Sequence, residues 1–128
     1  MARPEPPVGG QRMEALALAR ADRSLRCLPF RRAFYEEVAG QPISSAELCR
    51  REDWPSLVFA PFGPERAEDH FIWLIRLGVL RREVDGQGLT ERVRLTPMGR
   101  TLLKRWSGEI PRAGLRDRIQ ENFLRHRP

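Results

Sequence analysis

The chain has 128 residues and a mass of 14.8 kDa, which is enough for one domain and too little for two independent hydrophobic cores. Hydrophobic residues make up 41% of the chain and charged residues 31%, which excludes a collagen-like or membrane-embedded protein and is typical of a soluble globular domain. Basic residues outnumber acidic ones by 23 to 17, and the net charge of +6 favours a polyanionic partner such as nucleic acid.

The positive charge is unevenly distributed along the chain. Residues 97–128 carry eight basic and three acidic residues, so five of the six excess charges lie in the last quarter. Every basic residue except Lys104 is arginine, a bias that genome composition alone can produce. A basic C-terminal segment is therefore weaker support for nucleic-acid binding than a basic recognition surface would be.

No segment has the roughly 20 apolar residues that a membrane helix needs, and the N-terminus lacks the apolar part of a signal peptide. We therefore expect a cytoplasmic protein that does not enter a membrane. The two cysteines, Cys27 and Cys49, stand 22 positions apart, which indicates neither a disulfide framework nor a zinc site. We expect two half-buried thiols, and neither a metal nor a cofactor.

The first part of the chain predicts a leader followed by two helices. Residues 1–11 are rich in proline and glycine, and we expect them to be disordered. The Ala- and Leu-rich segment 12–24 predicts the first helix. Apolar residues at helical spacing predict a second helix, with Pro29 in its first turn and Gly40 at its end.

Two further helices and a connecting segment are predicted in the middle of the chain. Ser44, followed three residues later by Glu47, has the form of a capping box and predicts a short helix that ends near Asp53. Residues 54–64 contain three prolines and predict a connecting segment with a short extended piece. A longer helix is predicted over 64–77, with acidic residues in its early turns.

Beyond this helix the apolar period changes to about two, which predicts a β-hairpin. Its strands are residues 79–84 and 92–95, and the loop 85–88 contains two glycines that supply positive φ. Thr96 and Pro97 predict the cap and first turn of a helix that ends at about Trp106. Residues 112–126 predict a last, amphipathic helix.

Three segments carry a resemblance to a known class of protein: 42–48 (PISSAEL), 74–82 (LIRLGVLRR) and 95–103 (LTPMGRTLL). Over residues 28–106 the chain resembles the winged helix-turn-helix domains of MarR- and PadR-type bacterial regulators, and it is also similar to a small, functionally unassigned cyanobacterial family. The predicted fold class is α+β, mainly α with one β-hairpin. It consists of a winged-helix domain over 12–110, including an N-terminal helix, and a basic C-terminal helix over 111–128.

The resemblance implies that the helix 64–77 enters the DNA major groove and that the hairpin contacts phosphates or the minor groove. We therefore predict a small transcriptional regulator that binds double-stranded DNA. Its expected DNA contacts are Arg66 on the helix and Arg81, Arg82, Gln87, Arg92 and Arg94 on the hairpin. The alternative is that these arginines are ordinary solvated residues. Pairing of their guanidinium groups with carboxylates of the same molecule would remove the basis for predicting DNA binding.

The chain also departs from a helix-turn-helix. About ten residues, 54–63, separate the two helices instead of three or four. The helix 64–77 starts with three acids and one base, which repel phosphate, and residues 71–75 are apolar around most of a turn. These features favour a second hypothesis, a winged-helix protein-interaction module. Its interface would include Phe59 and Trp73, unless Trp73 is core under residues 57–60.

The last helix offers a further predicted interface. Leu115, Ile119 and Phe123 recur at a spacing of four, and we expect them to form contacts in a homodimer. The alternative is that they pack back on the same chain. A two-fold dimer is expected if DNA is the ligand, since half-sites then match the symmetry of the protein.

An enzymatic function is not expected. The two histidines, His70 and His126, belong to no metal-binding or catalytic motif, and the chain has no nucleophile elbow or phosphate-binding loop. We expect Cys49 to be a structural thiol buried on its helix. The alternative is that the two arginines that follow it lower its pKa and make it an oxidant sensor.

Overall fold

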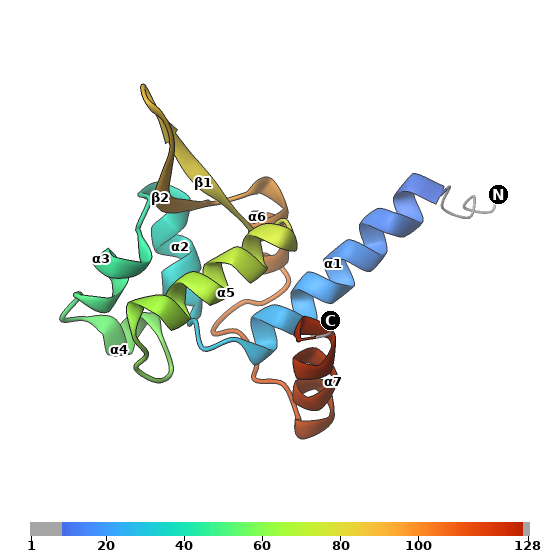
Figure 1. Cartoon of the computed structure of the whole chain (residues 1–128). Helices are drawn as coiled ribbons and strands as arrows, with labels where there is room; N and C mark the ends of the chain where they lie inside the picture. Colours follow the sequence, from blue (N-terminus) through green and yellow to red (C-terminus); the bar gives the residue numbers. More distant parts are fainter. Residues whose placement is uncertain (1–8, 127–128) are drawn as a thin grey trace.

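Residues 9–126 are described by the computed structural model, which contains seven helices and one antiparallel β-hairpin over these residues (Figure 1). The expected α+β class is therefore confirmed. In chain order the elements are α1 (Gly9–Cys27), α2 (Arg32–Gly40), α3 (Ser45–Cys49), α4 (Trp54–Leu57), α5 (Pro64–Arg76), β1 (Leu80–Asp85), β2 (Gly88–Leu95), α6 (Pro97–Leu103) and α7 (Leu115–Arg125).

Local signals in the sequence account for several of these boundaries. The Ser44 side chain caps α3 by accepting a hydrogen bond from the backbone N–H of Glu47 at 3.1 Å. Thr96 caps α6 in the same way, with the N–H of Gly99 at 3.1 Å. The chain leaves α5 through Gly78, whose φ of +88° is a conformation that glycine adopts readily. These caps and the start of α5 at Pro64 agree with the sequence prediction.

Other boundaries differ from the prediction. Helix α1 starts at Gly9, so residues 9–11 of the expected leader are helical, while residues 1–8 lie outside the described part of the chain. Pro29 precedes α2, because its carbonyl accepts from Phe59 N–H at 2.7 Å in an extended pairing of Phe30 with Val58. The predicted connecting segment contains this extended piece and the single turn α4. Helices α3 and α6 end earlier than expected, at Cys49 and Leu103.

Aromatic rings from three parts of the chain form the centre of the core. Phe30 and Phe34 stack with ring centroids 4.5 Å apart, and Phe34 lies 5.7 Å from Phe71 of α5. These three rings and Tyr35 are fully buried. The contact between Phe34 and Phe71 joins α2 to α5. Phe30, just before α2, is joined to the segment that follows α4 through its pairing with Val58.

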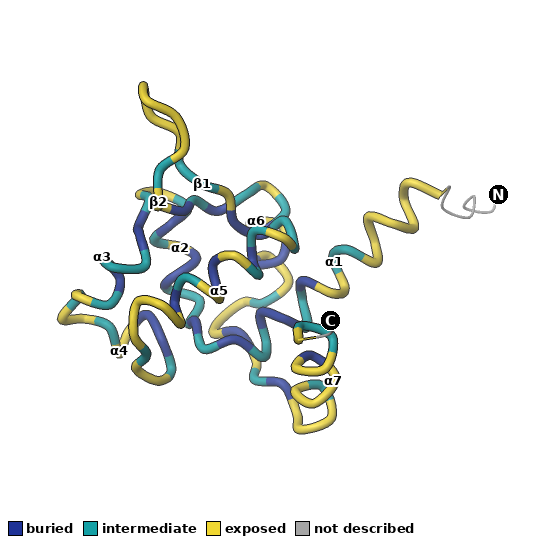
Figure 2. The backbone as a smooth tube through the Cα atoms, in the orientation of Figure 1, coloured by how far each residue is buried: buried dark blue, intermediate teal, exposed yellow. Residues whose placement is uncertain are grey.

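The hairpin pairs Leu80 with Leu95 and Asp85 with Gly88, with an irregularity between Arg82 and Val84. Of the two glycines in the predicted turn only Gly88 has a positive φ, +116°. A further bridge pairs Ile43, before α3, with Val93 at 2.9 and 3.3 Å, so the hairpin is attached to the helical body through a third extended segment. The tip extends into solvent (Figure 2).

Helix α1 is buried only near its C-terminal end, where Ala21, Ser24 and Leu25 contact the body. Its first half projects away from the rest of the molecule and is exposed (Figures 1 and 2). Helix α7 lies beside the buried half of α1, and much of its surface is exposed as well. The two terminal helices therefore form a unit at one end of the molecule.

Candidate functional site

Three of the four hairpin arginines form ion pairs with carboxylates of the same molecule. Arg82 pairs with Glu68 of α5, Arg94 pairs with Glu83 on the opposite strand, and Arg92 donates to Glu47 of α3 at 2.8 Å. Hydrogen bonding from Arg92 and Arg94 lowers the pKa of Glu47 and Glu83, respectively, so both carboxylates are charged at neutral pH. Arg81 is exposed and has no such pair among the ion pairs of the described residues.

The hairpin is consequently almost neutral. Residues 80–95 contain four arginines and three acids, a net charge of +1. Gln87 is exposed at the tip, where its backbone N–H donates to Asp85 at 2.7 Å. Arg82, Arg92 and Arg94 are thus paired with carboxylates of the same molecule, and this pairing removes the basis for predicting DNA binding through these three residues. DNA binding itself stays an untested prediction.

The segment between α3 and α5 covers the first turns of α5. Phe62 meets the rings of Phe30 and His70 edge-on, each with a centroid distance of 5.7 Å. The thiol of Cys49 donates to the Phe62 carbonyl at 3.3 Å, and burial raises the pKa of this thiol. A raised pKa agrees with the expected structural thiol and not with the alternative of an activated one. Arg66 remains exposed on α5.

Phe59 does not offer a free ring for a partner. The guanidinium groups of Arg31 and Arg112 lie over the ring, each 4.3 Å from its centroid. Phe59 is half-buried between elements that are far apart in sequence. In this structure the ring holds the segment after α4 against the segment before α7, and its role in a partner interface stays a prediction.

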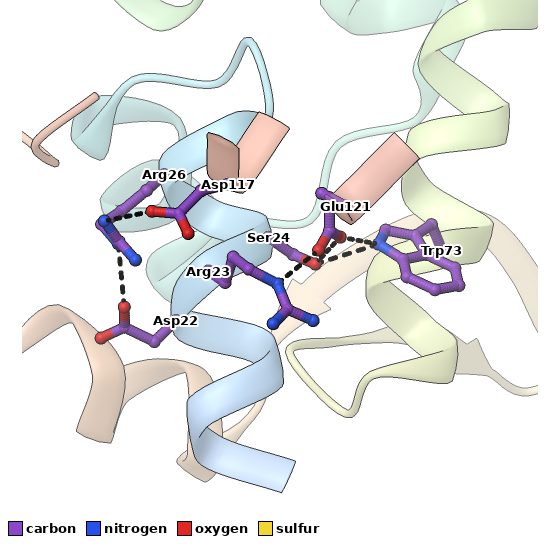
Figure 3. Close-up of polar contacts among 7 residues, drawn as sticks. All are labelled: Asp22, Arg23, Ser24, Arg26, Trp73, Asp117 and Glu121. Atoms are coloured by element: carbon purple, nitrogen blue, oxygen red, sulfur yellow. Dashed lines mark hydrogen bonds and ion pairs between the residues drawn. The ribbon is translucent and has the colours of Figure 1, made fainter. Parts of the chain in front are cut away.

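Trp73 is also used internally, and its neighbours differ from those expected. Its indole N–H donates to Glu121 at 3.1 Å and to Ser24 at 3.2 Å (Figure 3). Arg23 donates to the same carboxylate at 3.1 Å. Trp73 is half-buried, its indole N–H is directed at α1 and α7, and its role in a partner interface stays a prediction. It joins α5 to α1 and α7.

The face of α7 that contacts the body is polar. Glu121 is the buried residue of this helix, whereas Leu115, Ile119 and Phe123 are 74%, 62% and 69% exposed. The alternative that these three side chains pack back on the same chain is therefore wrong. Their predicted role as dimer contacts remains open, and the row they form on α7 is called the apolar row below.

Sequence reasoning missed the residues that bind α7 to the body. Glu121 and Arg125 looked like ordinary charges in a basic helix, and no local pattern distinguishes them. Arg125 donates to Nδ1 of buried His70 at 2.8 Å, so the histidine carries its proton on Nε2. Burial, followed by the charges of Arg125 and Arg66, lowers the pKa of His70 to about 4. The one feature of the sequence that could have indicated this contact is the position of His70 beside the apolar residues 71–75.

Residues 9–126 contain neither a cluster of metal-ligating side chains nor a helix that could span a membrane. Within this range no group of three or more His, Cys, Asp or Glu side chains is placed to hold a metal ion. No described helix has the length and apolar character needed to span a bilayer.

The described residues define an α+β domain in which a β-hairpin projects from a body of helices and the two terminal helices pack together. A family model described as Npun_F0494-like matches residues 11–125, nearly the whole chain. The protein belongs to the Npun_F0494-like family. No curated protein and no solved structure matches it.

Proposed function

We propose that this protein is a winged-helix protein-interaction module whose interaction surface is formed by α1 and α7, and that a second copy of the chain occupies that surface. The winged-helix assignment is supported by the order of elements from α2 to α6. It is also supported by the bridge between Ile43 and Val93, which adds a short third strand to the hairpin.

The observation that carries the proposal is the apolar row on α7. Its three side chains are more than 60% exposed on a helix whose opposite, polar face is buried. Leaving three large apolar side chains in water is unfavourable, and covering them in an interface removes that cost. A contiguous exposed apolar surface of this kind is typical of an interaction site.

The projecting half of α1 argues for a second copy as the occupant. Residues 9–20 are almost entirely exposed, including Met13 at 72% and Leu16 at 64%. A helical segment of this length is marginal in water without tertiary contacts. Each chain thus has an apolar arm on α1 and an apolar row on α7. Two copies related by a two-fold axis can cover both surfaces reciprocally.

Light scattering coupled to gel filtration tests this proposal. We expect a dimer for the native protein and a monomer for Ile119→Glu, because a buried charge in the interface lacks a partner. Gln120→Glu is the matched control, since it adds a charge at an exposed neighbouring position outside the row. A native protein that is monomeric at hundreds of micromolar, or a dimer unaffected by Ile119→Glu, would contradict the proposal.

DNA binding is the second candidate. It is supported by the extended wing-like hairpin, by the exposed Arg81 and Gln87, and by the net charge of +6. It is disfavoured by the ion pairs of the other hairpin arginines. The two candidates are compatible, because a dimer would present two hairpins.

A further inference from the structure

Several arginines of the C-terminal quarter of the chain line a groove on the surface of the molecule. Two adjoining cavities of about 590 and 630 Å³ lie between α5 and α7. Both are lined by Arg66 and His70 of α5 and by Asn122 and Arg125 of α7. The larger cavity adds Arg112 and Arg118, so four guanidinium groups border one concave surface.

These guanidinium groups lack carboxylate partners. Among the ion pairs of residues 9–126, none involves Arg66, Arg112, Arg118 or Arg125. Arg125 donates to a neutral histidine instead. Two acids line the groove: Glu121 in the larger cavity, which already accepts from α1 and from Trp73, and Asp69 in the smaller one. They stand against five arginines, Arg66, Arg76, Arg112, Arg118 and Arg125. The groove therefore has an uncompensated positive charge.

Arg112 shows the imbalance most directly. Its Nη2 donates to the Leu28 carbonyl at 2.6 Å, but its Nη1 is buried without a hydrogen-bond partner among the described residues. Buried polar atoms are nearly always satisfied in native proteins. Burial lowers the pKa of Arg112, and the neighbouring charge of Arg118 lowers it further. A bound anion would offset both effects.

The other wall of the larger cavity is apolar. Phe59, Pro61 and Phe62 line it together with Leu28 and Pro29. Its volume lies in the range of small-molecule sites, which combine an apolar wall with a few charged groups that orient the ligand. An arginine cluster beside aromatic rings fits an anion that has an apolar or aromatic body.

We propose that the groove between α5 and α7 binds a small organic anion. Its phosphate or carboxylate group is held by Arg66, Arg118 and Arg125, and its body lies against Pro61 and Phe62. Arg112 adds to the positive field. The groove uses a different face of α7 from the apolar row, so this site does not depend on the dimer. A concave site between two helices favours a small molecule over the convex backbone of duplex DNA.

The test is an NMR titration of the ¹⁵N-labelled protein with phenyl phosphate at pH 7. We expect saturable shifts of the Trp73 indole N–H and of the backbone amides of Arg66, His70 and Asn122. Inorganic phosphate should bind more weakly, because it has no apolar body, and benzyl alcohol should not bind at these positions. Equal affinity for the three compounds would overturn the proposal.

The matched variants are R66Q/R118Q in the groove and R50Q/R81Q outside it. All four side chains are exposed and the change in net charge is identical, so both variants should keep the fold. The first should lower the affinity for phenyl phosphate at least about tenfold, and the second should leave it unchanged. No saturable shift in the native protein, an equal loss in both variants, or tighter binding of a short DNA duplex to the same amides would overturn the proposal.

Discussion

At the residue scale, the carboxylate of Glu121 connects three helices. Glu121 of α7 accepts hydrogen bonds from Arg23 and Ser24 of α1 and from Trp73 of α5 (Figure 3). Its side chain is 7% exposed, so the carboxylate depends on these donors for its solvation. The position of α7 on the body is therefore determined by polar contacts and not by an apolar interface.

We expect Glu121→Ala to lower the free energy of unfolding by about 3 kcal/mol, because Arg23 and Ser24 lose this acceptor and Trp73 keeps only Ser24. Glu121→Gln keeps an acceptor for Trp73 and should have a smaller effect. Urea unfolding measures both, and hydrogen exchange should show that the amides of α7 lose protection first. A cost no larger than that of Gln120→Ala, at the exposed neighbour, would contradict this account.

His70 makes stability depend on pH. Its pKa falls from an ordinary value of 6.5 to about 4 in the folded state, so the unfolded chain binds the proton more readily. Stability is therefore lost as the pH falls from about 6.5 to about 4. The loss at pH 4 is on the order of 3 kcal/mol, since each pKa unit corresponds to about 1.4 kcal/mol.

The comparison variant is His70→Gln, whose side-chain oxygen can still accept from Arg125 but does not titrate. Urea unfolding at pH 7 and at pH 4 should show a loss for the native protein that exceeds the loss for His70→Gln by about 3 kcal/mol. The carboxylates titrate equally in both proteins, so their contribution to the loss of stability cancels when the two proteins are compared. The same loss in both would mean that the pKa of His70 is not depressed.

At the scale of elements, the close approach of α6 to the hairpin requires a glycine. A Cβ on Gly99 would overlap with Leu95 Cδ1 and would lie 2.8 Å from the Val79 carbonyl oxygen. The leucine side chain has some freedom to move, but the carbonyl belongs to the backbone. The small residue in the LTPMGR segment is thus a packing requirement.

Gly99→Ala should destabilise the fold by about 2 kcal/mol, because overpacking outweighs the gain of about 1 kcal/mol in helix propensity. Gly40→Ala, at the end of α2, is the control, since a Cβ there meets nothing within 4 Å. It should be neutral or slightly stabilising. Thermal unfolding measures both variants, and equal melting temperatures would contradict the packing argument.

The distribution of charge decides what the whole molecule can bind. The hairpin has a net charge of +1, while the groove between α5 and α7 has four arginines without carboxylate partners. We expect weak retention on random duplex DNA, with a salt dependence equivalent to about one neutralised phosphate, or about 0.9 log units of affinity per decade of salt.

Arg81→Glu tests how much the hairpin contributes to the affinity for DNA. Arg20→Glu on α1 is the control, because it changes the net charge by the same amount at a position outside the hairpin. We expect both variants to change the affinity for DNA by the same small amount. A selective loss in Arg81→Glu, together with a slope of several phosphates, would establish the DNA-binding candidate. Fluorescence anisotropy over a range of salt concentrations provides the affinities.

Much of the fold could be predicted from local patterns. The caps at Ser44 and Thr96, the start of α5 and the hairpin follow from side chains that act within a few residues of their own position. The extended pairing of Phe30 with Val58 could not be predicted, because it joins residues that are far apart along the chain.

The sequence by itself determined the class of fold, the alternation of the hairpin and the excess of arginine near the C-terminus. Only the tertiary structure decided which charges neutralise one another, because Arg92 meets Glu47, and Arg23 meets Glu121, across distances along the chain that no local pattern encodes. It also decided that α7 turns its polar side inward. The physical reason is the same in both cases: Coulomb and hydrogen-bond energies depend on separation in space, which the packing of distant elements sets.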